Sequence, residues 1–350
     1  MAATPSASPV DWSRIIESVL SGAHLPEDDA ADVMDHIMAG DAVEAQIAGL
    51  LVALRSKGES ASEIAGFVRS MVAAATPIEL EGPLLDTCGT GGDGAGTFNI
   101  STLAAVVCAA AGVKVAKHGN RAASGQCGSA DLLEAWGVVI DLPPAAVATT
   151  VRELGIGFLY ARSFHPAMRH VAPVRGHLGI RTVFNVLGPL SNPAGATRQV
   201  VGVADKRLAP VMAEALARLG KEHAFVFRGE DGLDELTTTG PSQVWEVRGG
   251  VVEETLFDPK GIGLERARLE DLQGGSVDEN VSIADAVLAG ERGPAADIVA
   301  LNAGAGMYVA GVVDRVAEGT ARAVEVLESG AAAELRDRWV ARSQELAEEA

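Results

Sequence analysis

The sequence predicts an α/β protein, with a small all-helical N-terminal domain and a larger α/β domain that has a mainly parallel central sheet, a C-terminal hairpin and C-terminal helices. Three observations predict this class. Only helical apolar patterns occur up to about residue 78, short β-branched runs alternate with helical ones after Pro83, and two alternating runs flank Gly249-Gly250. A chain of 350 residues with 48% hydrophobic content can bury a large core and is long enough for two domains. We place the boundary where the pattern changes, which divides the chain into residues 1–80 and 81–350.

The first domain is predicted from four apolar stripes at helical spacing, over residues 12–20, 33–38, 43–54 and 64–72. Asp11 is a candidate N-cap for the first stripe, and Asp41 with Glu44 resembles a capping box for the third. Helices with one apolar stripe each bury it against one another. We therefore expect a small helical bundle.

The second domain alternates strand and helix patterns, which is typical of a parallel sheet. The candidate strands are residues 113–116, 138–140, 156–160, 200–203 and 224–227. The helices between most of them lie near 101–111, 129–136, 144–154 and 207–219. Residues 242–248 and 251–256 predict a hairpin, and helices near 294–310, 314–328 and 330–349 end the chain.

The charge balance limits the kinds of partner. The 47 acidic residues outnumber the 28 basic ones, the formal charge is −19, and no Lys/Arg block is present, so we expect neither nucleic acid nor a membrane as partner. Three cysteines (Cys88, Cys108 and Cys127) are too few and too irregularly spaced for a disulfide framework or a zinc site. No uncharged apolar run reaches about 18 residues and the first residues do not resemble a signal peptide, so we expect a cytoplasmic protein.

The most informative segment is GTGGDGAGTFNIST at 89–102. Its five glycines between 89 and 96 let the backbone turn its N–H groups inward. Asn99, Ser101 and Thr102 add side-chain donors where an apolar helix begins and its dipole is positive. The natural ligand of such a cradle is a phosphate or diphosphate. A tight strand-to-helix connection is the alternative, but it does not account for the polar residues.

A second polar cluster, KHGNRAASGQCGSAD at 117–131, follows the strand predicted at 113–116, and ligands of open α/β sheets collect at such strand ends. Lys117 and Arg121 can neutralise phosphate oxygens, and Ser129 would cap the following helix. A structural histidine is the alternative for His118. A structural ion pair is the alternative for Arg121.

A third feature is the pair Asp234-Glu235 in DGLDELTTTG. Adjacent carboxylates in a turn-like stretch can reach Mg²⁺ that is bound to a diphosphate. In so acidic a chain, a solvated turn is the default interpretation of this pair taken alone.

A fourth feature is PVRGHLGIRTVFNVLGPLSNP at 173–193, which contains Arg175 and Arg181. Arg175 could pair with an organic carboxylate through two parallel hydrogen bonds, and a surface arginine is the alternative. His165 and Met168, just upstream, would line the same pocket.

Together these motifs resemble the anthranilate phosphoribosyltransferase family, and the resemblance extends through nearly the full chain. The matching segments are GTGGD (89–93), NIST (99–102), KHGNR (117–121), GSAD (128–131), the region of Arg175, RTVFNVLGPLSNP (181–193) and the DE pair (234–235). Several ordered motifs in one chain are far more specific than a single glycine loop.

The resemblance implies transfer of the 5-phosphoribosyl group from phosphoribosyl diphosphate (PRPP) to the amine of anthranilate with release of diphosphate, the second step of tryptophan biosynthesis from chorismate. It assigns catalysis to Lys117 and His118, and Mg²⁺ binding to Ser101, Asp234 and Glu235. PRPP would contact Gly89, Gly92, Asp93, Thr97, Asn99, Ile100, Ser101, Thr102, Lys117, Asn120, Arg121, Ser124, Gly125 and Ser129. Anthranilate would contact Gly89, His118, Asn120, His165, Met168 and Arg175.

The resemblance also implies the fold of the pyrimidine nucleoside phosphorylases, with helices near 174–195 packed on the small domain, the active site in the cleft between domains, and a homodimer formed through the helical domain. The chain departs from the family pattern at two places. Ala122 and Ala123 replace an expected polar stretch, and Met168 occupies a position where an aromatic residue would also fit the pattern.

Two rival functions remain at this point. One is another ribosyl transferase of the same fold, such as a nucleoside phosphorylase. The other is a non-catalytic relative that binds nucleic acid, which the charge of −19 and the intact Asp234-Glu235 pair oppose.

Overall fold

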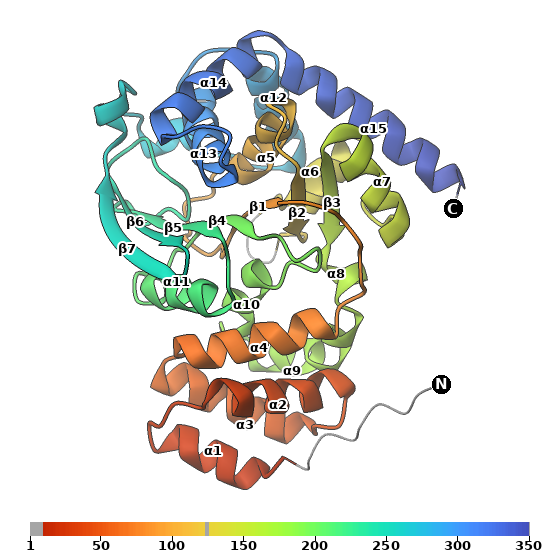
Figure 1. Ribbon diagram of the computed structural model, residues 1–350, viewed down its shortest axis with the longest axis vertical. Helices are drawn as coiled ribbons and strands as arrows, with labels where there is room; N and C mark the ends of the chain where they lie inside the picture. The colour runs from red at the N-terminus through yellow and green to blue at the C-terminus, as the bar shows by residue number, and fades with distance from the viewer. Residues whose placement is uncertain (1–9, 123–125, 350) are drawn as a thin grey trace.

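The computed structural model describes residues 10–122 and 126–349 (Figure 1). The chain begins with four helices: α1 (Trp12–Leu20), α2 (Glu27–Ala39), α3 (Glu44–Lys57) and α4 (Ala61–Ala73). Asp11 caps α1 as predicted, because its carboxylate accepts the N–H of Arg14 at 3.1 Å. The predicted Asp41/Glu44 box is wrong. Val43 is the N-cap of α3, and its N–H donates to the side chain of Gln46 at 3.0 Å.

A seven-stranded sheet forms the centre of the molecule, in the order β3-β2-β1-β4-β5-β6-β7. The first five strands of this order are parallel, and β6 and β7 add an antiparallel hairpin. Their bounds are β1 (Leu85–Gly89), β2 (Val115–Gly119), β3 (Ile156–Tyr160), β4 (Arg198–Gly202), β5 (His223–Gly229), β6 (Ser242–Arg248) and β7 (Val251–Phe257). The mainly parallel sheet and the C-terminal hairpin are confirmed.

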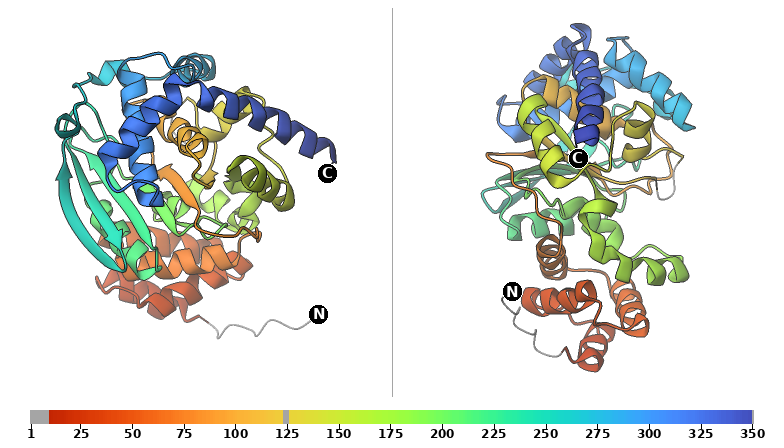
Figure 2. Two further views of the ribbon diagram at one scale, coloured as in Figure 1. Left: turned by 45° about the horizontal axis from the view of Figure 1, so that its top comes forward. Right: turned by 90° about the vertical axis from the view of Figure 1, so that its right-hand side faces the viewer.

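Helices cover both faces of the sheet (Figure 2). One face is covered by α5 (Ile100–Ala110), α6 (Ser129–Ala135), α12 (Val277–Leu288), α13 (Pro294–Ala310), α14 (Val316–Glu328) and α15 (Ala331–Glu349). The other face packs on α9 (Ala172–Leu178), α10 (Phe184–Leu190), α11 (Leu208–Arg218) and the bundle α1–α4 in one shared core. Near β3 lie α7 (Pro144–Leu154) and α8 (Ala161–Phe164), and the 3₁₀ turn Pro166–His170 contacts α2, α8 and α9. Further 3₁₀ turns occupy Pro259–Ile262 and Leu269–Leu272. In the described part of the chain, no helix combines the length and apolar character that a membrane span needs.

Two details of the predicted strands are corrected. Residues 138–140 form no strand, because Val138 closes the end of α6 by donating to the Leu133 carbonyl at 2.9 Å, and Val139 donates to Ser343 of α15 at 3.0 Å. The strand predicted at 113–116 is shifted. It runs over Val115–Gly119 as β2, so Lys117 and His118 belong to the strand rather than to the loop after it.

Candidate active site

The carboxyl ends of β1 and β4 lie side by side, and each ends in a glycine. Gly89 and Gly202 are partners in the parallel register. A Cβ on Gly89 would lie 2.5 Å from Oδ2 of Asp234, and one on Gly202 would lie 1.6 Å from the Asp234 carbonyl oxygen. The segment that carries Asp234 and Glu235 can therefore lie directly against both strand ends, because neither has a side chain there.

The glycine-rich loop that leaves β1 is held through Gly91. Its N–H donates to Oδ2 of Asp234 at 2.6 Å, and its carbonyl accepts from Nη2 of Arg181 at 3.1 Å. Gly91 and Gly92 have φ angles of 64° and 79°, which favour glycine. A Cβ on Gly92 would lie 1.6 Å from Arg181. Sequence reasoning gave Arg181 no role, since a contact between segments so far apart in the chain leaves no local pattern.

The carboxylates of Asp93, Asp234 and Glu235 face one another beside this loop. Burial raises the pKa of Asp234 to about 6, and the charge of Asp93 adds to the increase. Burial and then the charge of Asp234 hold the pKa of Glu235 well above its ordinary value. Oδ2 of Asp93 is buried without a hydrogen-bond partner in the described structure. Carboxylates that repel one another in this way fit a bound cation.

The acidic group fits Mg²⁺ in a particular way. Among the described residues, no three His, Cys, Asp or Glu side chains are arranged to hold a metal by themselves. Mg²⁺ is usually bound by one or two carboxylates together with substrate phosphate oxygens. The residues present therefore fit a cation that arrives with a diphosphate.

Lys117 reaches the same region from β2. Its side chain is buried, and its Nζ donates to the Thr87 carbonyl at 2.6 Å and lies 3.4 Å from Oγ of Ser101. Burial lowers the pKa of Lys117, while the charges of Asp86 and Glu235 oppose that decrease. A hydrogen bond from the Ser101 backbone in turn lowers the pKa of Glu235. The ammonium group and the predicted metal ligands therefore lie close together.

The remaining predicted phosphate contacts lie at and before the start of α5. Asn99 is the N-cap residue of this helix. The side chains of Ile100 and Thr102 are buried, and the N–H of Thr102 donates to the Asn99 carbonyl at 3.1 Å. Thr97 forms an isolated bridge with Gln273. Ile100 and Thr102 therefore anchor the helix in the core of this structure.

A cavity of about 890 Å³ lies where β1, β2 and β3 meet α9 and α10. Tyr160 and Phe184, which sequence reasoning did not assign, contribute aromatic surface to its wall. The structure brings together on this wall all six residues predicted to contact anthranilate: Gly89, His118, Asn120, His165, Met168 and Arg175.

The two histidines of this cavity are buried neighbours, with ring centroids 5.1 Å apart. Nδ1 of His118 lies 3.1 Å from the Gly188 carbonyl and must donate to it, so Nε2 is the acceptor nitrogen of the neutral ring. That Nε2 is buried and has no partner in the described structure. Burial lowers the pKa of His118 and of His165 to about 4. His118 is therefore neutral at neutral pH and has an unused acceptor.

Arg175 enters the cavity from α9. Its guanidinium carbon lies 5.7 Å from the centre of the Phe184 ring, and within the described residues it makes no side-chain hydrogen bond or ion pair. Burial lowers the pKa of Arg175 below its ordinary value, and an arginine stays charged in proteins. An unpaired guanidinium in the wall of a cavity fits a carboxylate ligand.

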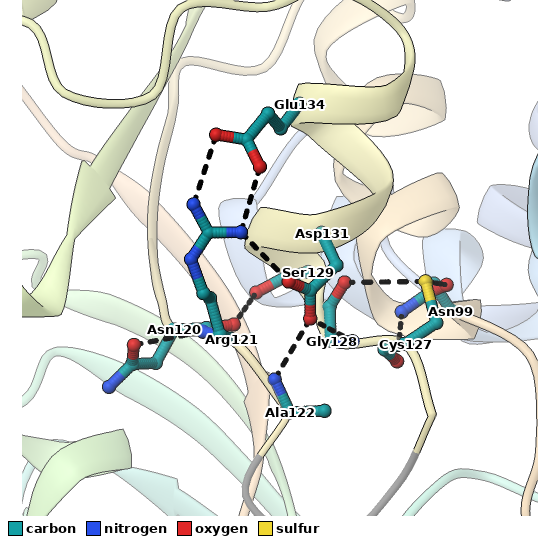
Figure 3. Close-up of polar contacts among 9 residues, drawn as sticks. All are labelled: Asn99, Asn120, Arg121, Ala122, Cys127, Gly128, Ser129, Asp131 and Glu134. Atoms are coloured by element: carbon teal, nitrogen blue, oxygen red, sulfur yellow. Dashed lines mark hydrogen bonds and ion pairs between the residues drawn. The ribbon is translucent and has the colours of Figure 1, made fainter. Parts of the chain in front are cut away.

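Arg121 lies against α6 (Figure 3). Its Nη1 lies 3.0 Å from Asp131 and 2.8 Å from Glu134. This ion pair is the alternative that the sequence left open for Arg121. Asn120 lies next to it, exposed, and its carbonyl accepts the N–H of Ala130 at 3.2 Å.

The start of α6 differs from the prediction. Gly128, not Ser129, is the N-cap, and its N–H donates to Asp131 at 2.8 Å. Ser129 instead donates its hydroxyl to the Asn120 carbonyl at 3.2 Å. The predicted contacts Ser124 and Gly125, and the departure at Ala123, lie outside the described residues.

A smaller cavity adjoins the large one, since Asn185 lines both. Gly89 lines the large cavity, whereas Gly92 and Asp93 line the second cavity of about 300 Å³ together with Arg181. The segment from the end of β1 into the glycine loop therefore reaches both cavities.

The sequence and the fold match known proteins over almost the whole chain. Residues 13–75 match the helical bundle domain of a glycosyl transferase family, and residues 81–333 match its a/b domain. The anthranilate phosphoribosyltransferase of Arthrobacter sp. is 51% identical over 345 residues, which cover 97% of this chain and 98% of the relative.

Solved structures agree with this relation. Anthranilate phosphoribosyltransferase from Thermus thermophilus is 52% identical, with a TM-score of 0.89 over 94% of this chain and 99% of that one. The Saccharomyces cerevisiae enzyme in complex with PRPP and Mg is 28% identical, with a TM-score of 0.88 over 97% and 99% of the two chains. The same yeast enzyme in complex with 4-fluoroanthranilate has a TM-score of 0.86, again at 28% identity, over 98% and 100%. This chain therefore belongs to the anthranilate phosphoribosyltransferases of that glycosyl transferase family.

Proposed function

We propose that this chain transfers the 5-phosphoribosyl group of PRPP to the amine of anthranilate and releases diphosphate, a step of tryptophan biosynthesis. The observation that carries the proposal is the position of Gly89. It lines the cavity that contains the unpaired Arg175, and it also lies directly against Asp234 of the acidic group. An aromatic acid and a metal-bound diphosphate would therefore meet at the end of one strand.

On the diphosphate side, Asp234, Glu235 and Ser101 would hold Mg²⁺, as the mutual repulsion of the acidic group suggests. When bound, the ion would neutralise charge on the departing diphosphate. Lys117 would add a charge-assisted hydrogen bond to the same group, and backbone N–H groups of the glycine loop would contribute partial positive charge. Asn99 and Ser129 would complete the PRPP contacts at the starts of two helices.

On the anthranilate side, Arg175 would bind the carboxylate and so aim the amine at C1 of the ribose. The C1–N bond forms as the bond from C1 to diphosphate oxygen breaks. The nitrogen is then positively charged and must lose a proton. Nε2 of His118 is a neutral acceptor in the same cavity and would take it, although its pKa near 4 makes it a weak base.

The domain division and the oligomeric state are also proposals. We propose a helical domain of residues 1–80, on which α9 and α10 pack, and an α/β domain of residues 81–350. The separate matches of residues 13–75 to a helical bundle domain and of residues 81–333 to an a/b domain support this division, and the core that the bundle shares with α9 and α10 supports their packing on it. We also propose a homodimer through the helical domain, supported by exposed Leu20, Val43 and Val52 on and beside α1 and α3. Light scattering on the parent and on Val52→Glu would test it, since a charged side chain should separate the subunits. Because charged phosphoribosyl compounds do not cross membranes unaided, we place the reaction in the cytoplasm.

The test of the activity is direct. Protein, Mg²⁺, anthranilate and PRPP are mixed, and loss of anthranilate fluorescence is followed with and without EDTA. Loss that requires PRPP and Mg²⁺ supports the proposal. Unchanged fluorescence together with phosphate-dependent cleavage of thymidine or uridine would instead make the chain a nucleoside phosphorylase.

A further inference from the structure

Asp131 lies beside the proposed PRPP contacts but has no role in the function proposed above. Its carboxylate accepts three hydrogen bonds: Oδ2 takes the N–H groups of Ala122 at 3.0 Å and of Gly128 at 2.8 Å, and Oδ1 takes Nη1 of Arg121 at 3.0 Å (Figure 3). The bond to Gly128 alone would be an ordinary helix cap. The bond to Ala122 is different, because it ties the end of the segment that follows β2 to the start of α6.

The contact between these two segments is close. A Cβ on Gly128 would lie 2.3 Å from the backbone nitrogen of Ala122 and 2.9 Å from the Asn120 carbonyl oxygen. The absence of a side chain at Gly128 therefore lets two backbone donors converge on one carboxylate. Partial burial tends to raise the pKa of Asp131, but the hydrogen bonds from Ala122, Gly128 and Arg121 outweigh it, and the pKa lies below its ordinary value.

The same contact point also reaches the start of α5. Nδ2 of Asn99 donates to the Cys127 carbonyl at 3.1 Å, and the Cys127 thiol donates to Oδ1 of Asn99 at 3.3 Å (Figure 3). Cys127 adjoins Gly128, which Asp131 holds. The carboxylate of Asp131 thus links Asn120 and Asn99, which belong to two different substrate motifs, through the backbone at Ala122 and Gly128 and the side-chain contacts between Asn99 and Cys127.

We propose that Asp131 is the positioning residue that joins the KHGNR segment to the start of α5 and so shapes the PRPP site. It contacts no substrate. This inference rests on the proposed function, because PRPP is the ligand that both segments are proposed to bind. Without Asp131, the bonds from Ala130 and Ser129 to the Asn120 carbonyl remain, but the backbone N–H groups of Ala122 and Gly128 lose their common acceptor. PRPP affinity should then fall while the Arg175 side of the site stays intact.

The test compares Asp131→Ala, Asp131→Asn and Asp131→Glu with the parent enzyme. We expect KM for PRPP to rise roughly tenfold or more in the alanine variant, since charged hydrogen bonds of this kind contribute about one factor of ten or more each. KM for anthranilate should change far less. Amide exchange at Ala122 and Gly128 should accelerate in the same variant. The glutamate variant should recover part of the PRPP affinity because it keeps a charged carboxylate. The asparagine variant should recover less, because its amide is uncharged and its NH₂ group would replace the oxygen that accepts from Arg121.

Glu134→Gln is the matched control. It removes an acid of the same helix that binds Arg121 but touches neither backbone donor. Kinetics and amide exchange close to the parent are expected. The proposal is overturned if Asp131→Ala keeps the parental KM for PRPP. It is also overturned if Glu134→Gln loses as much PRPP affinity as Asp131→Ala does. If the alanine variant does not fold, the asparagine and glutamate variants decide by the same criteria. The parent reaction itself tests the proposed function, whereas amide exchange reports on Asp131 whether or not the parent turns over.

Discussion

Replacing Asp234 by Asn should stabilise the metal-free protein while it damages catalysis. From the sequence alone we expect a neutral effect on stability, because a metal-binding carboxylate supports no core. The structure changes that expectation. Burial beside Asp93 and Glu235 raises the pKa of Asp234 to about 6, so its charged form is unfavourable in the folded state when no cation is present. Asn removes that charge, and its amide oxygen can still accept the N–H of Gly91.

The size and sign of the effect follow from proton linkage. A carboxyl whose pKa is higher in the folded state binds its proton more tightly there, so the free energy of unfolding falls as pH rises from about 4 to about 6 and stays lower above. A change from 3.8 to about 6 corresponds to about 3 kcal/mol. Solvent reaches part of the Asp234 side chain, so we expect about 1–2 kcal/mol to be recovered at pH 7.5, or about 1–3 °C in Tm for a chain of 350 residues.

Thermal unfolding in EDTA measures this directly, at pH 7.5 and at pH 5. The gain in Tm should shrink at pH 5, where the parent carboxyl is mostly protonated. Addition of Mg²⁺ with PRPP should stabilise the parent but not the variant. Asp231→Asn is the control in the same segment, and it should lower Tm because Asp231 accepts bonds from Leu233 and Thr237. A lower Tm for Asp234→Asn at pH 7.5 would mean that Asp234 mainly anchors the glycine loop.

Other variants test the remaining parts of the site. Lys117→Ala should weaken PRPP binding by roughly 1.5–3 kcal/mol in calorimetry and also lower Tm, because the Thr87 carbonyl loses its donor; unchanged PRPP affinity would remove Lys117 from the site. Arg175→Ala should raise the anthranilate KM roughly tenfold with a smaller effect on PRPP, and Arg175→Lys should recover it only in part; an unaltered anthranilate dependence would make Arg175 structural. Arg181→Ala should raise the PRPP KM because Gly91 loses its carbonyl partner, and parental steady-state kinetics would contradict that role. Turnover should fall below about pH 6 as Asp234 takes up a proton, and a profile flat to pH 5 would argue against a metal role.

Local patterns predicted most of the fold because each depends on neighbours in sequence. The strand expected at 156–160 has the same bounds as β3, and the four helical stripes became α1–α4. Strand β1 went unpredicted for a physical reason: it is central yet contains a buried Asp86. The carboxylate is tolerated there because it accepts the N–H of His118 at 3.0 Å and lies near the charge of Lys117. The five-residue pattern of β1 does not reveal which groups of β2 will pair with Asp86.

The same distinction between local patterns and distant contacts applies to the site. Residues within one motif could be named from the sequence, and the six expected anthranilate contacts do line one cavity. Arg181 and Asp131 lie in recognised motifs, but their roles could not be predicted: Arg181 binds the glycine loop from the segment between α9 and α10, and Asp131 binds the backbone of Ala122. Their roles depend on packing between distant segments. Arg121 is the opposite case. The sequence suggested it for phosphate binding, but in the structure its guanidinium pairs with Asp131 and Glu134 of α6.

The shifted end of β2 has a mechanistic consequence. Because the strand continues through Gly119, Lys117 and His118 point to opposite faces of the sheet. Lys117 contacts Ser101 of α5 on one face, and His118 contacts Gly188 of α10 on the other. A loop beginning at Lys117 would have allowed both side chains to approach one substrate. The pleat instead places the ammonium group on the side proposed for the departing diphosphate and the imidazole on the side proposed for the arriving amine. Anthranilate would then attack the ribose C1 of PRPP from the side opposite to the departing diphosphate, as an in-line displacement requires.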